Sequence, residues 1–365
     1  MTFTQLGRKG RATPKIDISR LLRQTTGLKK NESTGPVGDH SSMTYIIGVD
    51  EAGYGPNLGP LVIAATAWEI ADDSWTDLFT RVSPEIARPA DRSADTWLVV
   101  GDSKQLYTPQ KGLGPLESAV QSLLAESSQC ASDDLELFTM LCREPGSFEC
   151  NLPWYQTSAR SLPHPTPSNV AESPPHSSPL NQCLLNAGIR FHGASTQILE
   201  PDHFNSRCRE SGNKATVLSE ESIALLHRMI QQLPGRPKSI WCQCDRHGGR
   251  TRYGALLQAQ FNETFVEVHG ETSEQSTYRW GPENCRVEVR FSPGGERHWE
   301  VAWASMLAKY VRELAMERFN QFWKSHIDDL KPTRGYPVDA KRFRQDIEPI
   351  RERLKIPIDH LWRER

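Results

Sequence analysis

No run of apolar residues in this 365-residue sequence approaches the about 20 that a membrane-spanning helix needs, and the first residues lack the apolar core of a secretion signal. The eight cysteines follow no repeated metal-ligand spacing, so we expect buried thiols in a reducing cytoplasm. A formal net charge of −2 argues against a non-specific nucleic-acid coat, although it is compatible with a locally basic cleft. These absences favour a cytoplasmic protein with no membrane segment.

Hydrophobic periodicity is absent from residues 1–42, which carry eight Lys or Arg against three Asp or Glu. A segment of this composition buries too little apolar surface to fold, so we expect a disordered basic tail. Residues 43–365 are long enough to bury a sizeable core, and we expect them to form one domain.

Helix-forming composition is also missing between Pro145 and Pro179, where Pro and Ser cluster densely. Pro removes a backbone donor and breaks helices, so no helix is expected in this composition. The sequence predicts a flexible, variable insertion over residues 126–185, with solvated histidines that follow no ligand spacing.

What the sequence does contain is organised around residues 45–49, an apolar, β-branched run that ends at two adjacent carboxylates, Asp50 and Glu51. This pattern predicts a buried strand that delivers both carboxylates to an edge of a sheet. Because side chains alternate along a strand, the following turn has to bring the two together. Gly53 and Gly55 leave that turn free to approach a ligand closely.

A second strand-end carboxylate is predicted at Asp245, after the apolar run 239–244. The loop that follows is basic, with Arg246 and Arg250, and it suits a phosphodiester held beside a carboxylate. We interpret His247 as a polar loop histidine, with a proton shuttle as the alternative.

Two further stretches carry charged residues in patterns typical of helices. Asp102, Ser103 and Lys104 have the pattern of a helix cap with an exposed lysine, which suits a phosphate but is equally typical of a plain cap. Between residues 299 and 322, a long helical pattern places Ser305, Lys309 and Glu313 four residues apart on one stripe.

Other expected elements are strands at 61–68, 264–269 and 286–291, a strand pair or a strand and turn at 188–199, and helices at 116–124, from 201, at 219–233 and at 343–354.

Four stretches of the sequence resemble motifs of the type 2 ribonucleases H, the ribonucleases HII and HIII. Residues 49–56 (VDEAGYGP) resemble the family's Asp-Glu-Ala-Gly-Arg-Gly-Pro, and residues 102–106 (DSKQL) resemble its Asp-Ser-Lys-Lys-Leu. Residues 304–313 (ASMLAKYVRE) resemble Ala-Ser-Ile-Leu-Ala-Lys-Val-Thr-Arg-Asp without a gap, and residues 331–337 (KPTRGYP) resemble Lys-Gly-Tyr-Pro. Two positions depart from ribonuclease HII: Tyr54 stands for Arg, and Glu313 stands for the usual Asp, as in ribonuclease HIII.

The resemblance implies an α/β, ribonuclease H-like fold, with a mixed central sheet flanked by helices. To this the sequence adds the Pro/Ser-rich insertion and a C-terminal helical extension over residues 327–365. In such a fold, we expect four carboxylates to be the catalytic residues and the metal ligands: Asp50, Glu51, Asp245 and Glu313. All-oxygen ligands suit Mg²⁺ or Mn²⁺, and two such ions are expected.

The implied activity is that of an endonuclease which hydrolyses the RNA strand of an RNA/DNA hybrid and leaves 5′-phosphate and 3′-hydroxyl ends. The expected partner is such a hybrid or DNA that contains ribonucleotides, and a monomer is expected. The implied substrate-binding residues are Gly53, Tyr54, Gly55, Ser103, Lys104, Ser305, Lys309 and Tyr336. Because Tyr54 lacks the donors of Arg, we expect continuous hybrids to be cut better than single embedded ribonucleotides.

Two rival functions stay open at this point. The first is another metal nuclease on the same fold, such as a junction resolvase, which would not depend on a 2′-hydroxyl. The second is a non-catalytic module that binds hybrids. Metal-dependent cutting of a hybrid, but not of duplex DNA, separates the three.

Overall fold

Seven strands form one mixed sheet, which the computed structural model arranges in the order β5-β2-β1-β6-β9-β8-β7. β6 pairs in parallel with both β1 and β9, and the other pairs are antiparallel. The strands are β1 (Thr44–Ala52), β2 (Leu61–Ile70), β5 (Ile189–Leu199), β6 (Ser239–Asp245), β7 (Glu267–Glu271), β8 (Ser276–Trp280) and β9 (Arg286–Ser292). The carboxyl ends of β1, β6 and β9 therefore lie at the same edge of the sheet.

The structure describes residues 43–364, apart from 72–76, 109–111, 128, 143–147, 149–150, 159, 161, 163–177 and 236. The expected basic tail and the histidines of the Pro/Ser-rich segment lie outside the described residues. No helix among the residues described is both long and apolar enough to cross a membrane.

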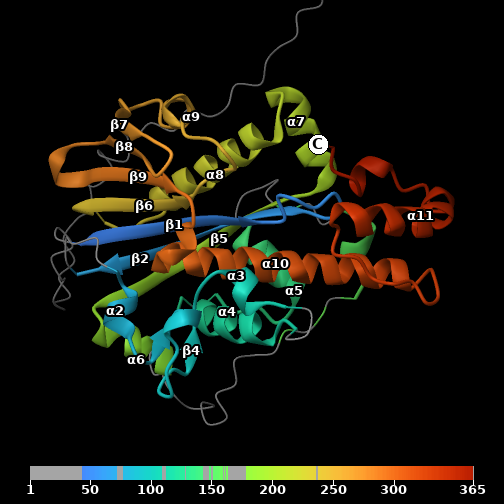
Figure 1. The fold of residues 1–365 in the computed structure, drawn as a ribbon, viewed down its shortest axis with the longest axis horizontal. Helices are drawn as coiled ribbons and strands as arrows, with labels where there is room; N and C mark the ends of the chain where they lie inside the picture. Colours follow the sequence, from blue (N-terminus) through green and yellow to red (C-terminus); the bar gives the residue numbers. More distant parts are fainter. Residues whose placement is uncertain are drawn as a thin grey trace, which may run out of the picture. The chain divides into compact units, whose positions relative to one another are not determined.

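Helices cover both faces of the sheet (Figure 1). On one face, α10 (Trp299–Lys324) runs across β1 and β2, together with α4 (Gly114–Glu126) and α5 (Asp134–Leu141). The other face is covered by α7 (Pro201–Ser211), α8 (Lys214–Gln231) and α9 (Gly254–Gln260). The remaining elements are the short pair β3 (Ile86–Ala87) and β4 (Leu98–Val99), the helices α2 (Phe79–Val82), α3 (Ser103–Leu106), α6 (Pro179–Asn186) and α11 (Pro337–Arg353), and the 3-10 turns η3 (Pro89–Asp91), η4 (Pro153–Tyr155), η5 (Glu283–Cys285), η6 (Gly295–Arg297) and η7 (Ile358–His360).

The contact between α10 and β1 depends on Gly48. A Cβ at this position would lie 2.1 Å from the backbone carbon of Glu300, so only glycine lets the helix approach the strand this closely. Alternation along β1 then divides its side chains: Ile46 packs on the α10 side, whereas Ile47 and Val49 pack on the α8 side. Asp50 therefore faces α10, and Glu51 starts from the opposite face.

The expected α/β class, with a mixed central sheet flanked by helices, is confirmed. The strands predicted at both carboxylate-bearing ends are present, and the long helix predicted over 299–322 is α10. β8 was not predicted, and α11 begins six residues before the expected start at 343.

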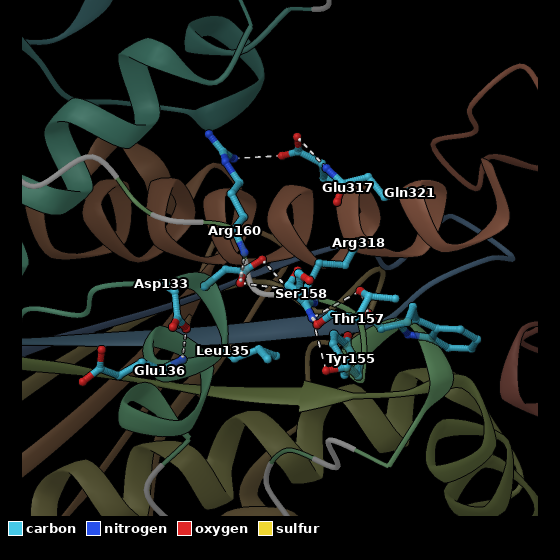
Figure 2. A network of polar contacts seen from close by, with 12 residues as sticks. Asp133, Leu135, Glu136, Tyr155, Thr157, Ser158, Arg160, Glu317, Arg318 and Gln321 are labelled. Atoms are coloured by element: carbon cyan, nitrogen blue, oxygen red, sulfur yellow. Dashed lines mark hydrogen bonds and ion pairs between the residues drawn. The ribbon is translucent and has the colours of Figure 1, made fainter. Parts of the chain in front are cut away.

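The prediction that residues 126–185 form a flexible insertion is wrong for the described part of that segment. It contains α5 and nearly all of α6, which bury apolar side chains such as Phe138 and Leu184 in the core beside α10. Figure 2 shows how the segment is held: Arg318 of α10 forms an ion pair with Asp134 at 3.0 Å and donates to the carbonyls of Tyr155 and Thr157. These buried contacts outweigh the helix-breaking composition nearby.

Candidate functional site

Asp50 and Asp245 end two adjacent parallel strands. The last paired residues of β1 and β6 are Val49 and Cys244, so the two aspartates follow side by side at the same edge. Cys242 and Cys244 pack on the α8 side, which puts Asp245 on the α10 side, where Asp50 also lies. The predicted convergence of these two strand-end carboxylates is therefore present.

Glu51 joins them electrostatically from the next position of β1. Burial raises the pKa of Asp50 well above its usual value, and the charges of Glu51 and Asp245 raise it further. Burial, followed by the charge of Asp245, raises the pKa of Glu51 to about 8. Glu51 Oε2 is a buried atom with no hydrogen-bond partner among the described residues. The charge of Asp245 thus acts on both Asp50 and Glu51, and the three carboxylates are referred to below as the strand-end trio.

Polar groups from α3, α10 and η6 surround the trio. Lys104 interacts with the charges of Asp50 and Asp245, and Asp102 caps α3 by accepting from the Lys104 N–H at 2.9 Å. Ser305 of α10 hydrogen-bonds the Asp50 carboxylate, and its Oγ lies 3.2 Å from that of Ser103. The Gly295 N–H also donates to Asp245 Oδ1 at 2.9 Å. The predicted residues Ser103, Lys104 and Ser305 are therefore brought to the trio.

Glu313 has different partners. Its carboxylate accepts from Lys309 Nζ at 2.5 Å and from the Tyr107 hydroxyl at 2.8 Å, and Arg312 Nη1 lies 3.6 Å away. Burial opposes ionisation, but Lys309, Tyr107 and Arg312 outweigh it and hold the pKa of Glu313 below its usual value. No contact among the described residues joins Glu313 to the strand-end trio.

Among the described residues, no three His, Cys, Asp or Glu side chains are arranged to hold a metal ion as they stand. The trio nevertheless fits a hard cation in its chemistry. Its donors are all oxygen, and one buried carboxylate oxygen has no partner among the described residues. Burial raises the pKa of Asp50 and Glu51, the charge of Asp245 raises both further, and a bound cation would relieve that repulsion. Mg²⁺ and Mn²⁺ take oxygen ligands, and Mg²⁺ keeps several waters, so a few carboxylates suffice.

The turn after β1 requires glycine at Gly53. Its φ is +91°, and a Cβ there would lie 2.2 Å from the Arg312 side chain, whereas Gly55 faces open space. Tyr54 is half-buried between them, with Lys214 Nζ 4.6 Å from its ring centroid. The turn therefore presents exposed backbone at Gly55 and a cation beside Tyr54.

Tyr336 is 52 % exposed and follows Gly335, whose carbonyl accepts from the Asn57 N–H at 2.7 Å. Two residues that the sequence did not single out extend this surface. The ring of Tyr107 has Lys309 Nζ 4.6 Å and Arg334 Cζ 5.4 Å from its centroid. Aromatic rings beside cations are typical of surfaces that bind nucleic acid. Tyr107 directly follows the motif at 102–106, and that position is the signal that could have identified it.

The interpretation of the loop after β6 as a basic phosphate-binding loop is wrong for two of its arginines. Arg246 donates to the carbonyls of Ser273 and Thr272, and Arg250 donates to Thr216. His247 is buried, not solvated, and burial, with the charge of Arg250, lowers its pKa to about 3. Burial keeps His247 neutral at physiological pH, and the hydrogen bonds of Arg246 and Arg250 hold the loop in place.

No protein-family model and no curated protein matches the chain. Among solved structures, the chain is similar to ribonuclease H2 from Pyrococcus horikoshii OT3, with 14% identity over 87% of this chain and 92% of that one, at a TM-score of 0.36. It is also similar to ribonuclease HII from Archaeoglobus fulgidus, solved with PCNA (16%, 88% and 94%, 0.35), and to Bst ribonuclease HIII in complex with Mn²⁺ (14%, 95% and 76%, 0.37). The function proposed below rests on the site itself.

Proposed function

We propose that the chain is a metal-dependent endonuclease that hydrolyses the RNA strand of RNA/DNA hybrids and leaves 5′-phosphate and 3′-hydroxyl ends. One observation carries the proposal. The strand-end trio, Asp50, Glu51 and Asp245, is half-buried at the ends of two parallel strands, contains a buried carboxylate oxygen with no partner among the described residues, and interacts with the charge of Lys104. A structural role gives no reason to gather three carboxylates where the charge of Asp245 makes Asp50 and Glu51 harder to ionise.

The trio would hold one or two Mg²⁺ or Mn²⁺ ions, which when bound supply an activated water and stabilise the leaving 3′ oxygen. Ser305 orients the Asp50 carboxylate, and the Gly295 N–H orients that of Asp245. Lys104 faces the trio as a point charge for the scissile phosphate. These contacts fix the carboxylates before any substrate arrives.

Glu313, on α10, is proposed as the fourth acidic residue of the site, available as a ligand only once its ion pair with Lys309 is released. Its partner Lys309 is itself a phosphate-binding candidate, so pairing of Lys309 with a substrate phosphate would release the Glu313 carboxylate. The substrate surface would then run from Gly53–Gly55, whose backbone faces the ribose 2′-hydroxyl, to the aromatic rings of Tyr107 and Tyr336. The 2′-hydroxyl distinguishes RNA from DNA at the cut.

The test compares three substrates with the same sequence: a continuous RNA/DNA hybrid, a DNA duplex with one ribonucleotide, and an all-DNA duplex. With Mg²⁺ or Mn²⁺, we expect cleavage of the RNA strand, 5′-phosphate products, no cutting of all-DNA and loss of cleavage in Asp50→Asn. Asp346→Asn, which changes a carboxylate of α11 paired with Arg342, is the matched control. Cutting of a four-way DNA junction without any ribonucleotide would favour the resolvase instead, and hybrid binding without cleavage would favour a binding module.

A further inference from the structure

A buried arginine that is distant in sequence hydrogen-bonds the turn that follows β1. Arg363 is 2 % exposed, and its Nη2 donates to the carbonyls of Gly53 at 2.5 Å and Pro56 at 2.6 Å. These two carbonyls bracket Tyr54 and Gly55, so one guanidinium holds both ends of the turn.

The backbone around Arg363 is fixed in turn. Its N–H donates to the Asn57 carbonyl at 2.7 Å, and Leu58 forms an isolated antiparallel bridge with Trp362. On the other side, Asn205 of α7 donates to the Trp362 carbonyl and accepts from the Glu364 N–H, both at 2.8 Å. The guanidinium is therefore delivered to the turn by a rigid segment.

Arg312 of α10 completes the arrangement from the other side. Its Nε donates to the Pro60 carbonyl at 3.3 Å. The two arginines hold backbone carbonyls of residues 53–60 toward the protein interior. The N–H groups of Tyr54 and Gly55, in contrast, donate to no backbone carbonyl or side chain of the described residues. Two adjacent N–H groups without internal partners on a fixed turn form a preorganised pair of donors.

This arrangement is costly for the fold. Arg363 lies near a second buried cation, and burial, followed by the charge of Arg312, lowers its pKa to about 9. Its Nε and Nη1 are buried without a partner among the described residues. Burying a charge that is only partly hydrogen-bonded rarely stabilises a protein, so its retention needs a reason other than stability.

We propose that Arg363 is a positioning residue that sets the Gly53–Pro56 turn so that its N–H groups meet the ribose of the substrate. The inference rests on the proposed function and deepens it, because it assigns the recognition of RNA over DNA to a residue outside every motif of the sequence. Arg363 acts through the turn and touches no reacting atom.

The test measures the dissociation constants of the continuous hybrid and of the all-DNA duplex without divalent metal, together with KM and kcat for the hybrid. In Arg363→Gln, we expect the preference for hybrid over DNA to fall roughly tenfold, because charge-assisted hydrogen bonds to the turn are lost. KM should rise by a similar factor, with kcat changed less than threefold. Arg363→Lys keeps the charge but reaches one carbonyl, and it should lie between wild type and Arg363→Gln.

Arg351→Gln is the matched control, since Arg351 of α11 also donates to a backbone carbonyl, that of Ile356, away from the turn. It should keep the full preference for the hybrid. Wild-type preference in folded Arg363→Gln, or an equal loss in Arg351→Gln, overturns the inference. If Arg363→Gln does not fold, Arg363→Lys decides by the same criterion. A wild-type protein that does not prefer the hybrid contradicts the proposed function itself.

Discussion

At the scale of single residues, the protonation behaviour of each carboxylate in the site depends on its burial and on its partners. Burial and neighbouring carboxylates raise the pKa of Asp50 and Glu51, whereas Lys309 outweighs burial at Glu313 and lowers its pKa. A sequence motif names residues but not their partners. The motif at 304–313 thus named Glu313 as a candidate ligand, which stays a prediction, but it did not reveal the ion pair with Lys309.

Tyr54 gives the prediction that belongs to this scale. Its ring lies 4.6 Å from Lys214 Nζ, so a lysine stands beside the side chain at the position where ribonuclease HII has an arginine. Arg offers a rigid fork of donors, and losing a charged contact to a phosphate typically costs about 1–3 kcal/mol. We expect the wild-type protein to cut continuous hybrids well and single embedded ribonucleotides comparatively poorly. Tyr54→Arg should shift the ratio of the two rates roughly ten- to hundredfold toward the single ribonucleotide.

The rates are measured on the two substrates at equal salt. Tyr54→Phe, which keeps the ring above Lys214, is the control and should leave the ratio unchanged. A wild-type preference for the lone ribonucleotide that Tyr54→Arg does not alter would show that this position does not set the substrate preference.

At the scale of elements, the sequence predicted what depends on local pattern. Apolar runs that end at carboxylates identified β1 and β6, and the periodicity of α10 gave nearly its full length. β8 carries only a weaker signal, an alternation in which Tyr278 and Trp280 are buried, with no apolar run and no terminal carboxylate. The burial of His247 accompanies a contact with Ser219, 28 residues away, which no local pattern contains.

Glu300, in the first turn of α10, makes the stability depend on pH. It is buried, its Oε1 has no partner among the described residues, and burial, with the charge of Asp77, raises its pKa to about 7. The folded chain therefore keeps this proton between pH 4.5 and 7, where the unfolded chain loses it, so stability falls as pH rises through that range. Glu300→Gln cannot ionise and should be more stable than wild type at pH 8, by roughly 3 kcal/mol at most, with little difference at pH 4.5.

Urea unfolding at the two pH values checks this prediction. Glu352→Gln, a change on the exposed side of α11, is the control and should show no such difference. An advantage of Glu300→Gln that is the same at both pH values would mean that ionisation of Glu300 is not its cause.

At the scale of the whole molecule, α10 is the axis that joins distant parts of the chain. Ser305 reaches the strand-end trio, Arg312 supports the turn after β1, and Arg318 holds the segment that contains α5 through Asp134. That buried ion pair was beyond sequence reasoning, because its two residues lie 184 positions apart. Composition alone suggested a loose insertion there, whereas tertiary contacts order the described part of it.

Breaking this ion pair from one side should be costly. Arg318→Met leaves Asp134 buried without its cation and is expected to destabilise the protein by about 3–5 kcal/mol. Replacing both residues, as Arg318→Met with Asp134→Leu, should recover much of that loss, since neither charge then stays buried alone. Chemical denaturation of the single and double variants gives the coupling energy. Additive losses in the double variant would show that the two side chains do not act as a pair.

Metal binding should appear in the stability of the whole molecule, independently of catalysis. A cation that binds only the folded protein stabilises it by about 2.7 kcal/mol when its concentration is 100 times the dissociation constant. We therefore expect Mg²⁺ or Mn²⁺ to raise the melting temperature of wild type, and Asp50→Asn, which removes one charge of the trio without changing its shape, to abolish the shift. Glu313→Gln should reduce the shift only in part, because the ion pair with Lys309 shows that Glu313 has another partner when no cation is bound. Asp346→Asn should behave as wild type. If wild type and Asp50→Asn show shifts of the same size, the cation binds elsewhere. If wild type and Glu313→Gln show equal shifts, Glu313 is not one of the ligands, although the strand-end trio can still be.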